Sequence, residues 1–470
     1  MNYQREGIKT LLNARGVDIS TGEISILSER FLLRFYCLHV RHLPKIRKML
    51  KQFVLHLDGS GESGKEIVFV AKDGIDGITL DARAMVSEAK EYIIPFLDKI
   101  KKGIGIPLAI VRDMGNAIRE ASIQVFPSVP HLICHYHFVR NLGDRLFSIR
   151  YTTFRSLLIR THALASISSI ERVHYNETIK EAEVIWVYIA TEYILHPREI
   201  ASKFPFILPY VEVMNRCIEV LALSEEIIRW NVGNNIFVKE IMELQNGIRK
   251  ITTNKEVRRS YFNLKRIWSW FEKMRKGMMV SRELSSHSLM KTEEMKKMTE
   301  SIKETLYNIM EEAKTISTEL EVSASMIDEE FKNHWDELFR VVVDKKGNGV
   351  KVVRHNGIEE LCHRENRKQI RMRTGRSSTT VEMGMYGALL SVFYNIKNKR
   401  YINRIMNKID LAEMRGISAE EMEEARKLIG EDNSLIVKSD KRRSMLLNKF
   451  VEILSNLNPV LFNHYKLFKV

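Results

Sequence analysis

The sequence is poor in cysteine and has no long apolar run, and each shortage excludes a class of protein. Its 470 residues include four scattered cysteines (Cys37, Cys134, Cys217 and Cys362), too few for a disulfide framework. No stretch of about eighteen apolar residues occurs, and the N-terminus lacks the pattern of a signal peptide. We therefore expect a soluble protein of a reducing cytoplasm, with no membrane partner.

The chain carries an excess of positive charge, with 74 Lys and Arg against 59 Asp and Glu, a formal net charge of +15. This excess favours a polyanionic partner, nucleic acid before membrane. A highly charged cytosolic protein without such a partner is the alternative. The hydrophobic fraction of 44% supports a real core, and the length allows two or three domains.

Hydrophobic patterning predicts an α/β core interrupted by helices. Strands are expected at 53–58, 66–71, 77–80, 107–113 and 131–134, with helices at 83–102 and 116–125 between the later strands. That order predicts a mixed sheet with helices on its faces. Five segments follow: 1–50, helical with a possible helix-turn-helix remnant; 51–148, the first part of the core; 149–360, all helical; 361–408, a basic segment and a helix completing the core; and 409–470, a helical tail.

Two of the predicted strands end on an aspartate. Leu57-Asp58 runs into a Gly-rich turn, and Asp113 ends the strand before the helix at 116–125. Neighbouring strands that end this way place two carboxylates side by side, where they repel each other unless a cation lies between them. Such a pair is typical of a divalent-metal site for phosphoryl transfer. We interpret the nearby Asp73 and Asp76 as turn residues and Asp81 as a helix cap.

A third acid for such a site is Glu382, in the first turn of a predicted helix. The run Thr379-Thr-Val-Glu382 also fits a capping box, in which the glutamate only satisfies backbone N–H groups. On local sequence the cap is favoured.

Several motifs together resemble one family of enzymes. They are Leu57-Asp-Gly-Ser60, Val111-Arg-Asp-Met-Gly-Asn-Ala117, the His131–Asn141 stretch, Arg371-Met-Arg-Thr-Gly375 and Ser378-Thr-Thr-Val-Glu382. The set, over residues 20 to 405, is similar to DDE transposases, closest to the mutator-like group and related prokaryotic insertion-sequence enzymes. The resemblance implies a ribonuclease-H-like core whose second aspartate and final glutamate are separated by a large helical insertion.

The resemblance also implies a function. Asp58, Asp113 and Glu382 match the catalytic residues, which in the family hold two Mg²⁺ or Mn²⁺ ions for cleavage and strand transfer at the ends of a mobile element. The implied partners are double-stranded DNA, as element ends and target, and a second copy in a homodimer or higher oligomer. In a prokaryote the protein would be associated with the nucleoid.

A basic run precedes Glu382, and we expect it to contact DNA phosphates. A solvated charged face is the alternative reading. From 364 to 408 there are eleven Lys and Arg and two Glu, a net charge of +9. The proposed DNA-binding residues are Arg364, Arg367, Lys368, Arg371, Arg373 and Arg376.

Cys134-His-Tyr-His137 matches a Cys/His signature of the mutator-like group, and Cys134 and His137 have the spacing of two zinc ligands. A structural zinc site needs four ligands, and Cys362 with His363 make an awkward second pair. We favour the simpler interpretation, without zinc, in which Cys134 is buried at a strand end and His137 packs nearby.

Two other functions stay open. Only about fifty residues precede Asp58, whereas many relatives carry a longer DNA-reading module there, so we consider a truncated chain. A catalytically inactive or repurposed transposase-derived DNA-binding protein is the main alternative. A nuclease with the same core, which cuts without joining, is the third.

Overall fold

The computed structural model describes residues 5–50, 52–61, 67–176, 182–197, 204–230, 235–278, 289–350, 352–354, 367, 389–396, 398–406 and 411–431. The chain divides into two compact units. Unit 1 comprises Met1–Tyr136, Ser281–Met298 and Trp335–Val470, and unit 2 comprises His137–Val280 and Thr299–His334. No helix of the described residues is long and apolar enough to cross a membrane.

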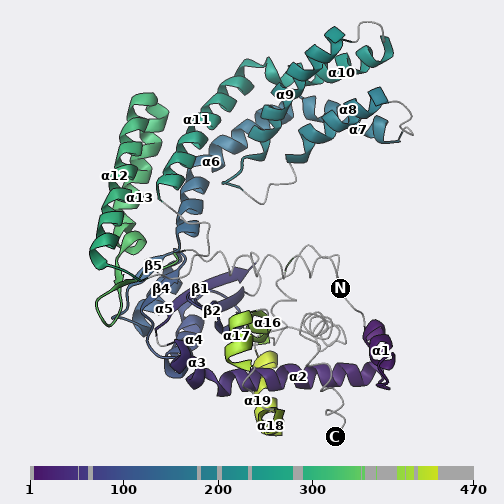
Figure 1. The fold of residues 1–470 in the computed structure, drawn as a ribbon. Coiled ribbons are helices and arrows are strands. Elements are labelled where there is room, and N and C mark those ends of the chain that lie inside the picture. The colour runs from purple at the N-terminus through teal and green to yellow at the C-terminus, as the bar shows by residue number, and fades with distance from the viewer. Residues whose placement is uncertain are drawn as a thin grey trace. The chain divides into compact units, whose positions relative to one another are not determined.

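A mixed five-stranded sheet forms the centre of unit 1 (Figure 1). The strands are β1 (Val54–Gly61), β2 (Ile67–Asp73), β3 (Thr79–Met85), β4 (Ala109–Arg112) and β5 (His131–Ile133), in the order β3-β2-β1-β4-β5. β1 to β3 pair antiparallel as a meander, whereas β4 and β5 run parallel to β1. The predicted order of strands and helices, and the mixed sheet, are confirmed.

The predicted helix at 83–102 begins too early. Its first residues belong to β3, and α4 covers Lys90–Gly103. Six of the seven β3 side chains are buried, and the strand pairs with β2 along its length, so sheet pairing overrides the helical spacing of Met85 and Ala89. α5 (Asn116–Val125) follows β4 as expected and packs against α4.

The two faces of the sheet are covered differently. The main core lies on one face and joins Leu55, Leu57 and Ile110 to helices from both ends of the chain. These helices are α1 (Arg5–Asn13), α2 (Thr21–Arg41), α3 (Leu43–Leu50), α16 (Leu390–Ile396), α17 (Lys399–Arg404), α18 (Leu411–Arg415) and α19 (Ala419–Glu431). The other face holds a smaller cluster, including Val54 and Val111.

A glycine turn ends the first N-terminal helix, and a capping box begins the second. Gly16 adopts a positive φ of 76° in the turn after α1. Ser20 then caps α2 as a full capping box with Glu23, since each side chain accepts from the other residue's backbone N–H. The predicted helical character of residues 5–50 is confirmed, while the helix-turn-helix function stays a prediction.

Unit 2 is built from helices. They are α6 (His135–Arg160), α7 (Ala163–Asn176), α8 (Ala182–Leu195), α9 (Pro209–Trp230), α10 (Asn235–Thr252), α11 (Lys255–Gly277), and most of α12 (Thr292–Ile316) and α13 (Thr318–Phe339). Aromatic pairs fill its core, as where Phe147 meets Phe271 edge-on with ring centroids 5.4 Å apart. Trp270 is buried and donates to the Ile309 carbonyl at 3.0 Å, which joins α11 to α12.

The prediction that residues 149–360 are entirely helical is wrong at three short strands. β6 (Leu289–Met290), β8 (Gly349–Val350) and β7 (Val342–Val343) form a small antiparallel sheet. Asp344 makes the turn between β7 and β8 by accepting from the Lys346 and Asn348 N–H groups, each at 2.8 Å. Val342 and Val350 then pack on the smaller cluster of the main sheet.

Candidate active site at the sheet edge

The parallel pairing of β1 and β4 aligns the segments that carry the two predicted aspartates. His56 is in register with Val111; Asp58 lies two residues further along β1, and Asp113 directly follows Arg112, the last residue of β4. Because side chains alternate along a strand, both continue the face that carries His56 and Val111. Asp58 is buried, with 4% of its surface exposed, and Asp113 is half-buried. Continued past Arg112, this register leads us to expect the two carboxylates on the same face of the sheet, near one another.

Two hydrogen bonds hold Asp113 in place, one to its side chain and one to its backbone. Its Oδ1 accepts from the Gly115 N–H at 3.0 Å, in the turn that leads into α5. Its carbonyl oxygen accepts from Nη1 of Arg112 at 2.8 Å. Arg112 is fully buried, and its Nη2 donates to Oε2 of Glu337 on α13 at 3.0 Å. Burial lowers the pKa of Arg112, while Glu337 opposes that shift, so this ion pair keeps a buried charge beside Asp113.

A third acid, missed in the sequence, lies beside the pair. A Cβ added to Gly59 would come within 2.4 Å of Oε1 of Glu88, so the Glu88 carboxylate reaches the residue after Asp58. The carboxylate end of this otherwise exposed side chain is partly desolvated. That desolvation raises the pKa of Glu88, and the negative charge of Asp113 raises it further. The Gly-rich turn predicted after Asp58 is wrong, because β1 continues to Gly61; Gly59 therefore lies inside a strand, where a glycine often marks a close approach.

The predicted third ligand, Glu382, lies outside the residues that the structure describes. So do Arg364, Lys368, Arg371, Arg373 and Arg376, as well as Cys362 and His363. Among the described residues, no three His, Cys, Asp or Glu are grouped so as to hold a metal ion. The structure therefore aligns the segments that carry Asp58 and Asp113 and places Glu88 beside Gly59, while a metal site with Glu382 stays a prediction.

One residue of the predicted basic run is described, and it contacts the end of β1. Nη2 of Arg367 donates to Oγ of Ser60 at 2.6 Å and lies 3.5 Å from the carbonyl oxygen of Gly61. Ser60 is two residues after Asp58. A guanidinium group is thus placed next to the strand end that carries the buried carboxylate.

Cys134 and His137 follow β5, where the chain enters α6. Cys134 is fully buried in the apolar cluster of Val111 and Leu132, as the simpler interpretation expects of this residue. His137 is half-buried. Between them, His135 hydrogen-bonds through Nε2 to the Leu338 carbonyl at 2.9 Å, and its N–H donates to the Arg354 carbonyl at 2.7 Å.

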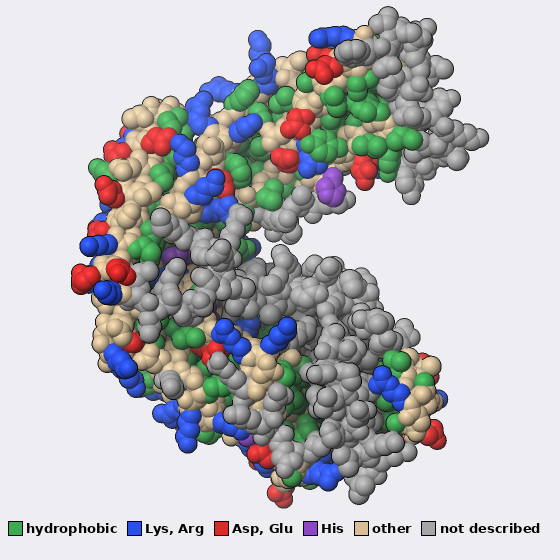
Figure 2. Space-filling model, in the orientation of Figure 1, with side chains coloured by type: hydrophobic (Ala, Val, Ile, Leu, Met, Phe, Trp, Pro, Cys, Tyr) green, Lys and Arg blue, Asp and Glu red, His purple; other side chains and the backbone are tan. Residues whose placement is uncertain are grey.

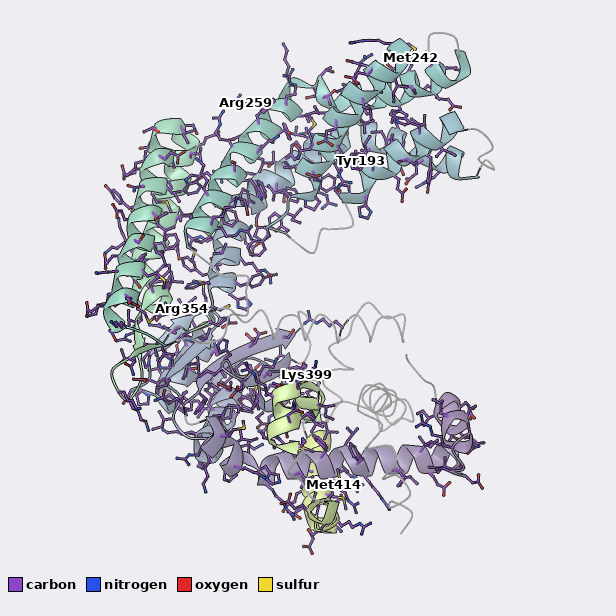
Figure 3. The ribbon with its side chains drawn as sticks, in the orientation of Figure 1. Tyr193, Met242, Arg259, Arg354, Lys399 and Met414 are labelled. Carbon is purple, nitrogen blue, oxygen red and sulfur yellow. The ribbon has the colours of Figure 1, made fainter. Side chains whose placement is uncertain are left out.

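Arg354 binds the same part of α13 (Figure 3). Its guanidinium donates to the carbonyl oxygens of Leu338 and Arg340, and burial lowers its pKa to about 10. These bonds fix the start of α6 against the end of α13. They account structurally for His135, which the sequence analysis did not select.

The other acids near the sheet have structural roles. Asp73 accepts from the N–H groups of Ile75 at 3.1 Å and Asp76 at 2.6 Å, as predicted for a turn residue. Burial raises the pKa of Asp73 to about 7. Asp81 does not cap a helix: it lies within β3 and pairs with Lys99 of α4 at 2.8 Å. The prediction of a helix cap at Asp81 was wrong because α4 starts at Lys90.

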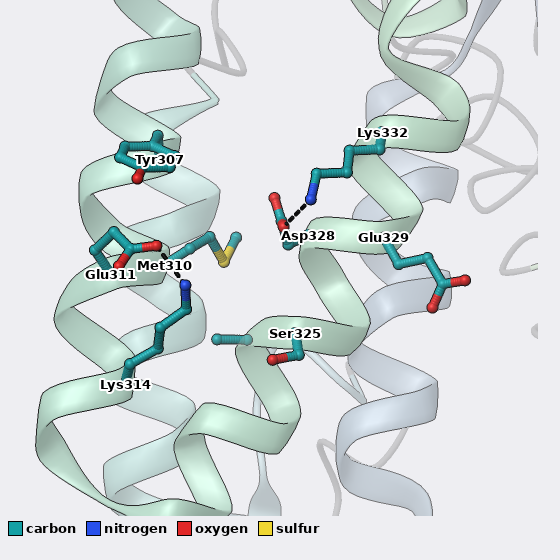
Figure 4. A pocket seen from close by; sticks show the side chains of 9 residues that line it. Tyr307, Met310, Glu311, Lys314, Ser325, Asp328, Glu329 and Lys332 are labelled. Atoms are coloured by element: carbon teal, nitrogen blue, oxygen red, sulfur yellow. Dashed lines mark hydrogen bonds and ion pairs between the residues drawn. The ribbon is translucent and has the colours of Figure 1, made fainter.

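A hollow of about 270 Å³ lies between α12 and α13 in unit 2 (Figure 4). Four of its charged side chains pair within their own helices, Lys314 with Glu311 and Lys332 with Asp328. None of the residues singled out from the sequence lines this hollow.

No protein-family model matches the sequence, and no curated protein shows significant similarity to it.

Proposed function

We propose that this chain is a DDE-type transposase, an enzyme that cleaves and joins DNA strands with the help of divalent cations. The observation that supports the proposal is the parallel register of β1 and β4, in which His56 pairs with Val111, two residues before Asp58 and Asp113 respectively. A mixed sheet in the order β3-β2-β1-β4-β5, with helices between its later strands, is also what a ribonuclease-H-like core requires. The resemblance of the motifs around these residues supports the same assignment.

The donor set fits hard divalent cations. Asp58 and Asp113 supply carboxylate oxygens, which Mg²⁺ and Mn²⁺ prefer. The pKa of Glu88 is raised first by desolvation and then by the negative charge of Asp113, a repulsion that a cation would relieve. In the proposal Asp58, Asp113 and Glu382 hold the ions. When bound, such ions stabilise the charge that develops during phosphoryl transfer and lower the pKa of an attacking hydroxyl.

The protein's own contribution is positioning. Arg112 holds the Asp113 backbone, and Glu337 holds Arg112, so the carboxylate is fixed before DNA arrives. Arg367, beside Ser60, offers a guanidinium that can exchange its serine partner for a DNA phosphate. The DNA strand would then lie against the end of β1 that carries Asp58.

A cleavage assay tests the proposal. Wild-type protein and the Asp58→Ala, Asp113→Ala and Glu382→Gln variants are incubated with supercoiled plasmid and Mg²⁺ or Mn²⁺, and nicked and joined products are separated on gels. We expect metal-dependent nicking and joining by the wild type, lost in each variant while circular dichroism stays unchanged. Nicking without joining would instead indicate a nuclease. Equal activity of the wild type and a triple variant would remove the assignment, and DNA binding without any cleavage would favour a repurposed DNA-binding protein.

A further inference from the structure

α11 in unit 2 separates its side chains into an apolar face and a cationic face. Its buried residues include Val257, Leu264, Phe271 and Met274. The opposite face carries exposed cations. Pairs of them are separated by three, four, seven or ten positions, and residues at these separations lie on one side of a helix. We name these five residues the α11 stripe: Lys255, Arg258, Arg259, Arg266 and Lys276. Arg259 is labelled in Figure 3.

The α11 stripe is not neutralised within the protein. Its five side chains form no ion pair or hydrogen bond with any residue that the structure describes. The same face holds Phe262 and Ser269 but no acid. Lys273, also on this face, is excluded from the stripe because it pairs with Glu312 of α12 at 2.6 Å. Figure 2 shows Lys and Arg side chains gathered over α11.

Charge is segregated among the helices. α11 holds eight Lys and Arg against two Glu, whereas α13 holds one Lys against seven acids, and α12 holds four Lys against six Glu. A uniformly solvated surface needs no such separation, and five unpaired cations on one face repel each other. The separation therefore indicates a ligand that supplies a row of negative charge.

We propose that the α11 stripe binds the phosphate backbone of double-stranded DNA. From Lys255 to Lys276 the helix rises about 32 Å, at about 1.5 Å a residue, close to the ~34 Å of one turn of B-DNA. A duplex presents one phosphate charge about every 1.7 Å along its axis, so several cations can be matched at once. Exposed Arg and Lys on a straight helix suit backbone contacts that position DNA without reading its sequence.

The choice of DNA as the ligand of the α11 stripe rests on the proposed function. The stripe itself is distinct from the sheet edge. It belongs to unit 2, whereas Asp58, Asp113 and Arg367 belong to unit 1. Binding through the stripe requires neither a metal ion nor cleavage, so the two ideas can fail separately.

The test is fluorescence anisotropy with a labelled 30-base-pair duplex in EDTA, across a series of salt concentrations. In the full chain, Arg258→Ala, Arg259→Ala and Arg266→Ala are combined. The loss of three phosphate contacts should reduce the slope of log K against log salt by about 2.7 and weaken binding about 100-fold at 0.15 M salt. Replacing the same arginines by lysine keeps the charge and should retain most of the affinity.

The matched control removes equal charge from α12, by Lys296→Ala, Lys297→Ala and Lys314→Ala, all exposed. Its affinity and slope should stay close to the wild type. The proposal is overturned if the α11 and α12 variants weaken binding equally, or if the α11 variant leaves the slope unchanged. It is also overturned if the α11 variant abolishes only self-association in sedimentation, or only binding to anionic vesicles. The two proposals can be told apart. If the wild-type protein never cleaves DNA, but it and the Asp58→Asn/Asp113→Asn variant both bind the duplex through the stripe, the DNA-binding proposal stands and the proposed enzyme activity is rejected.

Discussion

The edge of the main sheet and the α11 stripe hold charge in opposite ways. At the sheet edge one aspartate, Asp58, is buried within β1, another, Asp113, directly follows the parallel strand β4, and the buried Arg112, paired with Glu337, fixes the Asp113 backbone. On α11 five cations stand exposed along a helix with no neutralising partner among the described residues. The first arrangement suits chemistry, which depends on fixed geometry, and the second suits binding, which depends on summed charge. Substitutions should therefore separate cleavage from DNA affinity.

The largest expected effect separates the two regions directly. Asp58→Asn and Asp113→Asn should each reduce the cleavage rate by about 10³-fold or more, because several kcal/mol of charge stabilisation is lost. DNA affinity should change little, since no phosphate contact is removed. Single-turnover cleavage and anisotropy on the same preparations measure both quantities. A parallel fall in affinity would show that the two regions are not separable.

A buried acid at the end of β2, Asp73, predicts a pH dependence of stability. Burial raises the pKa of Asp73 to about 7. Between about pH 4 and 7 the folded chain binds a proton that the unfolded chain has released, so the free energy of unfolding falls as pH rises. The fall is at most about 4 kcal/mol, at about 1.4 kcal/mol per pKa unit.

Urea denaturation at several pH values measures this dependence. Asp73→Asn should flatten it, because the side chain no longer titrates. Asp18→Asn, at an exposed aspartate, serves as the control and should leave the curve unchanged. An unaltered pH dependence in the Asp73 variant would show that another group is responsible.

The ion pair behind Asp113 tests how firmly the sheet edge is fixed. Glu337→Gln should lower the free energy of unfolding by about 3 kcal/mol, because the fully buried Arg112 loses its counter-charge. Replacing both residues by apolar ones, Arg112→Met with Glu337→Leu, should recover part of that loss. Urea denaturation at neutral pH measures both. A double variant less stable than Glu337→Gln would contradict the account.

The smallest expected effect is at Gly59. In Gly59→Ala the new methyl group clashes with the flexible end of Glu88 and makes an ordinary contact with the Phe69 ring at 3.4 Å, so the free energy of unfolding should change by about 1 kcal/mol or less. The pKa of Glu88 should fall as its carboxylate moves into water, which NMR titration detects. Gly143→Ala in unit 2 is the contrast: its Cβ would lie 2.5 Å from the Pro205 ring and should cost about 2 kcal/mol.

The positions of the strands could be predicted because apolar runs are local signals. The predicted strand end at Asp58 was wrong, because pairing with β2 carries β1 through the expected Gly-rich turn to Gly61, whereas β4 ends at Arg112, directly before Asp113. The start of α4 was missed because Met85 fits both a helix and a buried strand, and only pairing with β2 decides between them. Glu88 was missed because its approach depends on the fold around Gly59.

The link between Arg112 and Glu337 could not be predicted, since 225 residues separate them. The cations of the α11 stripe are visible in the sequence, but only the structure shows whether neighbouring acids neutralise them. The basic surface predicted from the sequence lies at 364–376, of which the structure describes Arg367. Glu382 stays a prediction.

Calorimetric titration of Mn²⁺ into the wild-type protein and an Asp58→Asn/Asp113→Asn variant tests the central claim most directly. The account predicts saturable binding by the wild type that the double substitution abolishes, while thermal unfolding in EDTA shows that the variant is folded. Equal Mn²⁺ binding by the two proteins would contradict it, because the paired strand-end carboxylates would then hold no cation.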